Sequence, residues 1–182
     1  MLARSTLFCR LRDFTARFRI ARRGATAVEF AMLALPFFGL LCGILEIGMI
    51  FIVATTLDDA TTTAARTIRT GQLQTTGGSS ASSFVSTICT QLSWLGSNCN
   101  SNLSVDVETF SQFSSITPPQ LVVNGVYTPP TNYSIGGPGD IVVVRAYYQW
   151  ALFTPVMDQA MQTINGGKTL ITSTSTFRNE PY

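Results

Sequence analysis

Residues 30–54 read FAMLALPFFGLLCGILEIGMIFIVA, and this stretch decides the fold. Glu46 is its only charged residue, and about 20 consecutive apolar residues are enough to cross a bilayer as an α-helix. A chain of 182 residues rarely surrounds so long an all-round apolar helix, so a membrane span is favoured over a buried core helix. The stretch also exceeds the roughly 7–15 apolar residues of a secretory signal, so we expect it to remain as an anchor.

Charge is distributed unevenly along the chain. Residues 1–24 hold seven arginines and one acid, which gives 7 − 1 = +6, whereas residues 25–182 hold five bases and nine acids, which gives 5 − 9 = −4. Because positive flanks stay on the cytoplasmic side of a membrane, we expect a cytoplasmic N-terminus and an external body. The body has no basic stripe interleaved with aromatic residues, so we expect no nucleic-acid partner.

Histidine is absent from the sequence. This removes the commonest general base and the commonest metal ligand. We therefore expect no enzyme, no cofactor, no metal site and no small-molecule substrate.

Apolar residues continue at helical spacing beyond the span, which predicts one helix over residues 25–70. Gly71 is placed to end this helix, and Pro36 should kink it. The predicted organisation is a basic leader over residues 1–24, the long helix with a span at about 30–54, and a body over residues 71–182. The positions that continue the helical spacing are Leu57, Ala60, Ala64, Ala65 and Ile68.

The body alternates between helical and strand patterns. Strand and turn signals predict the following elements: a helix over 83–95, a half-buried strand near 103–108, a hairpin over 121–128 around Asn124-Gly125, a strand over 141–150, a short helix over 155–164 and a strand over 169–177. This order predicts an α+β fold, with an antiparallel sheet packed on the long helix.

At the junction of leader and span, residues 22–30 read RRGATAVEF. A glycine follows basic residues, and a glutamate stands five positions later. This resembles the processing site of type IV prepilins, which implies peptidase cleavage between Gly24 and Ala25. The resemblance assigns Glu29, at the fifth mature position, to pairing with the freed α-amino group of a neighbouring subunit. Thr26 and Glu29 also form a capping-box pattern, Thr-x-x-Glu, and the two roles can hold in different states.

Further motifs extend the resemblance over nearly the whole chain. They are GATAVEFA at 24–31, Leu35-Pro36, Glu46 before Gly48, Leu57…Ala60…Ala64-Ala65-Arg66, the Cys89…Cys99 pair followed by Leu-x-Val-x-Val, Tyr148-Gln149-Trp150 with Thr154-Pro155, and FRNEPY at 177–182. Together they resemble the TadE family of pseudopilins from the tight-adherence (Tad/Flp) pilus system. The sequence departs from that pattern at Ile47 and Met49, which leaves TadF- and TadG-like subgroups open.

The resemblance implies a minor pilin that acts in pilus assembly, anchored by one span in a bacterial inner membrane, with a periplasmic body. Glu29 and Phe30 would be its assembly residues. Its expected partners are the lipid bilayer, a prepilin peptidase, other pilins and Tad assembly proteins. The alternative is a membrane-anchored periplasmic enzyme or binding protein whose Gly-x4-Glu junction is coincidental.

Two features of the span have open interpretations. Glu46, as an intramembrane carboxylate, either pairs within a helical bundle or lies near the outer interface and reaches water. Gly39 and Gly43 form a small-residue motif that allows close helix packing, although such motifs also occur by chance in apolar sequence.

Cys89 and Cys99 both fall in the body, where the predicted oxidising compartment favours a disulfide over two free cysteines.

Overall fold

The computed structural model describes residues 22–75, 80–96 and 98–182. The chain forms two compact units, one ending at Ile44 and the other running from Leu45 to Tyr182. The basic leader up to residue 21 lies outside the described residues. The predicted organisation divides the chain at the ends of the long helix, whereas the boundary between the compact units falls inside it.

The apolar stretch lies in one helix, α2 (Arg22–Arg69), which continues without interruption through Pro36. The predicted end is confirmed. Gly71 has a left-handed φ of 76°, and its amide donates to the Ile68 carbonyl at 3.1 Å. A side chain here would also strike the ring of Tyr182, so the position suits glycine for two reasons.

Short helices follow α2. They are α3 (Gln72–Thr75), α4 (Ala81–Gln91), a 3-10 turn (Ser93–Leu95) and α5 (Cys99–Asn102). The Ser80 hydroxyl accepts the amide of Ser83 at 3.3 Å and so caps α4, while Phe84 and Ile88 are buried. The helix predicted over 83–95 is therefore present, with its last turn tightened into the 3-10 form.

Three strands form the main sheet in the order β1-β4-β5, with both pairs antiparallel. Their bounds are β1 (Leu103–Phe110), β4 (Ile141–Ala151) and β5 (Lys168–Arg178). A separate hairpin pairs β2 (Val122–Val123) with β3 (Val126–Tyr127) across Asn124 and Gly125, which both have positive φ, as a tight hairpin turn requires. Helix α6 (Pro155–Met161) follows β4, and a 3-10 turn (Phe113–Ser115) follows β1. The predicted α+β class is confirmed.

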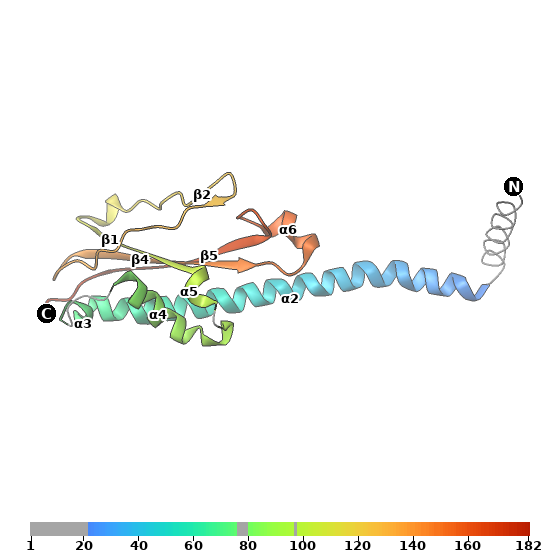
Figure 1. Ribbon diagram of the computed structural model, residues 1–182, viewed down its shortest axis with the longest axis horizontal. Helices are drawn as coiled ribbons and strands as arrows, with labels where there is room; N and C mark the ends of the chain where they lie inside the picture. Colours follow the sequence, from blue (N-terminus) through green and yellow to red (C-terminus); the bar gives the residue numbers. More distant parts are fainter. Residues whose placement is uncertain (1–21, 76–79, 97) are drawn as a thin grey trace, which may run out of the picture. The chain divides into compact units, whose positions relative to one another are not determined.

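One face of the sheet packs on the C-terminal part of α2 and on α4. Figure 1 shows β1, β4 and β5 running alongside that part of α2. The helix contributes the buried stripe Val53, Leu57, Ala60, Ala64, Ala65 and Ile68 to one hydrophobic core. Alternate strand residues meet this stripe from the sheet, among them Val105, Val107, Val142, Val144, Ala146 and Ile171.

The opposite face of the sheet is covered over β1 and β4, whereas Thr172, Thr174 and Thr176 of β5 are exposed on that face. The Tyr127 hydroxyl from β3 hydrogen-bonds the Ser104 hydroxyl of β1, and residues 132–134 pair with the outer edge of β1 at Val107. Asp106, on this second face, is therefore 1% exposed. The interpretation of β1 as a half-buried strand is wrong at this position, because a chain segment distant in sequence closes over it.

Candidate functional site

The predicted cleavage site lies at the start of the described part of α2. The helix already includes Arg22, so Gly24 and Ala25 are helical, and the first turn contains no acidic residue. Thr26 and Glu29 lie inside the helix, and the capping-box interpretation is therefore wrong for the uncleaved chain. Glu29 is exposed.

Gly24 is not required by packing. A Cβ added there meets no atom of the described residues within 4 Å. Glycine nevertheless lowers helix stability by about 1 kcal/mol relative to alanine, so the backbone around it unwinds more easily into the extended form that proteases bind. Packing within the described residues therefore does not explain a glycine at this position.

Phe30, the other predicted assembly residue, is 71% exposed and begins a large apolar surface. An 18-residue window of the helix has a mean hydropathy of 2.4, so by length and composition it is apolar enough to cross a membrane. Exposed apolar surface of this extent marks a contact with lipid or protein. The large exposed apolar residues of this part are Val28, Phe30, Met32, Leu33, Leu35, Phe37, Phe38, Leu40, Leu41 and Ile44.

Gly39 and Gly43 differ in their surroundings. Gly39 is exposed with open space around its Cα, whereas Gly43 is buried. The predicted close packing of this motif against another helix stays a prediction. Cys42, beside it, is a free and exposed cysteine.

Glu46 is fully buried, and its carboxylate has two partners from the same chain. Oε1 accepts the amide of Phe153 at 2.8 Å, and Oε2 accepts the amide of Thr154 at 3.2 Å. These amides immediately precede α6, where a helix start leaves N–H groups without helical partners. Neither interpretation from the sequence anticipated this arrangement, because both looked for partners outside the chain.

Cys89 and Cys99 form a disulfide, as predicted. The bond ties the C-terminal part of α4 to the first residue of α5, which leads directly into β1. It therefore fixes the entry of the chain into the sheet.

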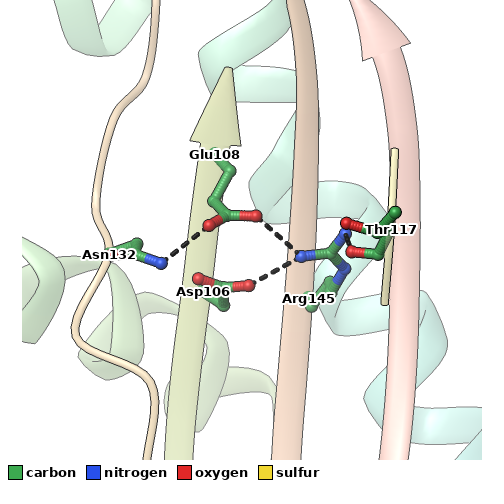
Figure 2. A network of polar contacts seen from close by, with 5 residues as sticks. All are labelled: Asp106, Glu108, Thr117, Asn132 and Arg145. Carbon is green, nitrogen blue, oxygen red and sulfur yellow. Dashed lines mark hydrogen bonds and ion pairs between the residues drawn. The ribbon is translucent and has the colours of Figure 1, made fainter. Parts of the chain in front are cut away.

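A buried ionic cluster lies on the second face of the sheet, and the sequence analysis missed it. Figure 2 shows the Arg145 guanidinium facing two carboxylates of β1. Its Nη1 lies 2.8 Å from Asp106 Oδ2 and 3.0 Å from Glu108 Oε2. Its Nη2 donates to the Thr117 carbonyl at 3.2 Å, and Asn132 Nδ2 donates to Glu108 Oε1 at 2.7 Å. The cluster thus joins two strands to the segment that covers them.

Burial perturbs the ionisation of this cluster. Desolvation raises the pKa of Asp106 even though the Arg145 hydrogen bond favours its charged form. For Arg145, burial alone would lower the pKa, but hydrogen bonds from its guanidinium to Asp106 and Glu108 raise it. Asp106 Oδ1 is buried and has no hydrogen-bond partner among the described residues. The geometry fits a structural cluster, since both Nη atoms of the cation donate to protein groups.

Within the described ranges, no group of three or more His, Cys, Asp or Glu side chains could hold a metal ion.

Comparison with known proteins gives a match that lies in the helix. A family model described as TadE-like protein matches residues 24–66, which begins at Gly24 and ends within the part of α2 that packs on the sheet. No curated protein and no solved structure matches the chain. Over residues 24–66 the chain is similar to the TadE-like family, in agreement with the motifs of that part of the sequence.

Proposed function

We propose that this chain is a minor pilin, or pseudopilin, that acts in the assembly of a Tad-type pilus after a prepilin peptidase cleaves it between Gly24 and Ala25. The observation that carries the proposal is the TadE-like match, which starts at Gly24, next to the proposed scissile bond. The exposed apolar surface of α2 supports it, because a helix of this kind can lie first in lipid and then against the helices of other pilins.

In the proposed sequence of events, the apolar helix enters the inner membrane with its arginine-rich leader in the cytoplasm. The peptidase then unwinds the first turn of α2 around Gly24. Cleavage creates an α-amino group on Ala25 and moves the helix start next to Glu29. In the intact chain Glu29 is seven residues beyond Arg22, whereas in the mature chain it would be four residues beyond the first residue.

Cleavage therefore changes what Glu29 can do. In a low-dielectric bundle an unpaired carboxylate is expensive, and so is an unpaired ammonium group. The Glu29 of one subunit would neutralise the new α-amino group of a neighbour, which favours assembly of processed chains over unprocessed ones. On this proposal the C-terminal unit is a periplasmic structural domain, and the protein is not an enzyme.

The test compares two glycines of the same helix. Gly24 and Gly48 both have open space among the described residues where a Cβ would be, so packing at that atom requires glycine at neither position. With a prepilin peptidase co-expressed, the wild type and Gly48→Phe should both yield a mature chain beginning at Ala25, and Gly24→Phe should keep its leader. Intact-mass measurement distinguishes the two forms. A wild-type chain that keeps residues 1–24 would contradict the proposal and favour the anchored enzyme or binding protein.

A further inference from the structure

We propose that the loop Leu152–Thr154 is a second lipid contact of the chain, which seats the C-terminal unit on the outer surface of the bilayer at the level of Glu46. The inference rests on the proposed membrane anchor and goes beyond it, since residues more than 100 positions from the span would also touch lipid. Its ligand is a lipid surface.

Glu46 holds the loop through its backbone. Both carboxylate oxygens are engaged by consecutive backbone amides, those of Phe153 and Thr154. The carboxylate is buried, so these amides replace the hydration that it would have in water. This arrangement fixes the backbone of Phe153 beside one defined turn of α2 and allows a charged residue to lie at the edge of an apolar layer.

An exposed apolar surface surrounds this contact. Phe153 is 54% exposed although its backbone is held by a buried group. The turns of α2 beside Glu46 carry further exposed apolar side chains, while Val53 and Leu57 of the same helix face the core. The exposed set within the C-terminal unit is Leu45, Ile47, Phe51, Ile52 and Phe153.

The length of the apolar sequence indicates that the partner of this surface is a lipid bilayer. From Gly24, the first residue after the arginines, to Leu45 there are 45 − 23 = 22 residues, which rise about 33 Å as an α-helix. A hydrocarbon core is about 30 Å thick, so a span that starts after the arginines ends at Glu46. Ile47, Phe51 and Ile52 then lie in the interfacial layer, and Phe153, held by Glu46, lies at the same depth.

A lipid interface suits these side chains better than water does. Aromatic and aliphatic side chains gain free energy by entering the boundary between headgroups and acyl chains. The carboxylate needs no snorkelling to water because its two oxygens already have donors. The outer boundary at Glu46 is earlier than the end of the predicted span of residues 30–54, and it agrees with the interpretation that Glu46 lies near the outer interface.

The experiment uses the full-length chain in vesicles of phosphatidylethanolamine and phosphatidylglycerol that contain a tritiated phospholipid. A photoreactive p-benzoylphenylalanine is incorporated singly at the positions of Phe153, Phe113 and Phe38, and lipid adducts are measured after illumination. Phe113 is the matched control, since it is 58% exposed but lies on the turn after β1. Phe38 reports on the span itself.

We expect lipid adducts at positions 153 and 38 and none above background at 113. Adducts at 38 without adducts at 153 would overturn this inference and leave the anchor intact. Absence of lipid adducts at position 38 would overturn the membrane anchor, and with it the lipid contact of the loop. Equal labelling at 153 and 113 would also overturn the inference, because the contact would not be specific to the loop.

A second variant tests the part assigned to Glu46. In Glu46→Gln one of the two acceptor oxygens becomes a donor that faces a backbone N–H, so the loop loses one of its two attachments. The adduct yield at position 153 should fall while that at position 38 is unchanged. An unchanged yield at 153 would show that Glu46 does not hold the loop at the membrane.

Discussion

The N-terminal part of α2 and the C-terminal unit differ in which side chains they expose and which they bury. From Gly24 to Ile44 the helix exposes large apolar side chains, and its described residues include almost no buried side chain. The C-terminal unit buries not only an apolar core but also charged groups, namely Asp106, Arg145 and Glu46. One region needs partners from its surroundings, whereas the other satisfies its own charges.

This contrast indicates where stability resides and where function can reside. A protein interior tolerates charge only when each group is paired, so substitutions in the C-terminal unit should act through folding. The exposed helix has few intrachain contacts to lose, so substitutions there should act through membrane insertion and assembly. Unfolding of the detergent-solubilised protein, monitored by near-UV circular dichroism, separates the two cases.

The largest effect is expected in the buried ionic cluster. Arg145→Met leaves the carboxylate of Asp106 buried without its cation, and breaking such a pair costs about 3–5 kcal/mol of the free energy of unfolding. Arg69→Met is the matched control, because Arg69 pairs with Glu180 at 3.0 Å but both side chains are about half exposed. Its cost should be about 1 kcal/mol or less. Similar losses for the two variants would contradict the account of the cluster.

Within α2 itself, the two regions can be compared directly with one type of substitution. Leu57→Ala removes a fully buried side chain from the core and should cost about 2–5 kcal/mol. Leu33→Ala, at an exposed position, should leave the unfolding transition unchanged. If Leu33→Ala destabilised the domain as much as Leu57→Ala, the helix would not be divided as described.

The disulfide should stabilise the C-terminal unit to a smaller extent. Replacing both Cys89 and Cys99 by serine removes a cross-link between residues that are 10 positions apart in the sequence. We expect the free energy of unfolding to fall by about 2–3 kcal/mol. Cys42→Ser is the control, since Cys42 is free, and it should not shift the transition. A transition of the double variant that coincides with the wild type would show that the bond adds nothing to stability.

Alkaline pH should weaken the C-terminal unit through its buried tyrosines. Burial raises the pKa of Tyr147 to about 12, whereas an unfolded tyrosine titrates near 10. Above about pH 10 the unfolded state therefore loses the proton first, and stability should fall as the pH rises towards 12, by at most about 2–3 kcal/mol from this residue.

In Tyr147→Phe this alkaline loss should be smaller but not absent, because burial also raises the pKa values of Tyr127 and Tyr148. Denaturation midpoints measured at several pH values test this. Identical pH profiles for the variant and the wild type would assign the alkaline loss to other groups.

The sequence predicted the local elements well, because their signals are local. Asn124-Gly125 indicated the hairpin, Gly71 the end of the long helix, and Pro155 the start of the short helix α6, and each is present. Helical spacing from Leu57 to Ile68 likewise identified the buried stripe of α2.

Contacts between distant segments could not be predicted in the same way. Glu46 and Phe153 are 107 residues apart, and no local pattern links them. Two signals were nevertheless present in the sequence. Arg145 interrupts the apolar run of β4, so it required acids on a neighbouring strand, and Asp106 and Glu108 occupy alternate positions of β1. Glu46 is the only charged residue of the apolar stretch 30–54, so its carboxylate required hydrogen-bond donors such as the amides at a helix start.

Glu29 gives the most direct test of the central claim, which is that the mature helix takes part in pilus assembly. Glu29→Ala, produced in a strain whose own copy is deleted, should cost about 1 kcal/mol or less of local helix stability, because an exposed helix carboxylate contributes little. The account predicts that Glu29→Ala is inserted and largely processed to begin at Ala25, yet does not support surface pili, and that Glu29→Asp is intermediate. N-terminal sequencing and a count of surface pili measure both properties in the same cells, and normal piliation by the processed Glu29→Ala chain would contradict the claim.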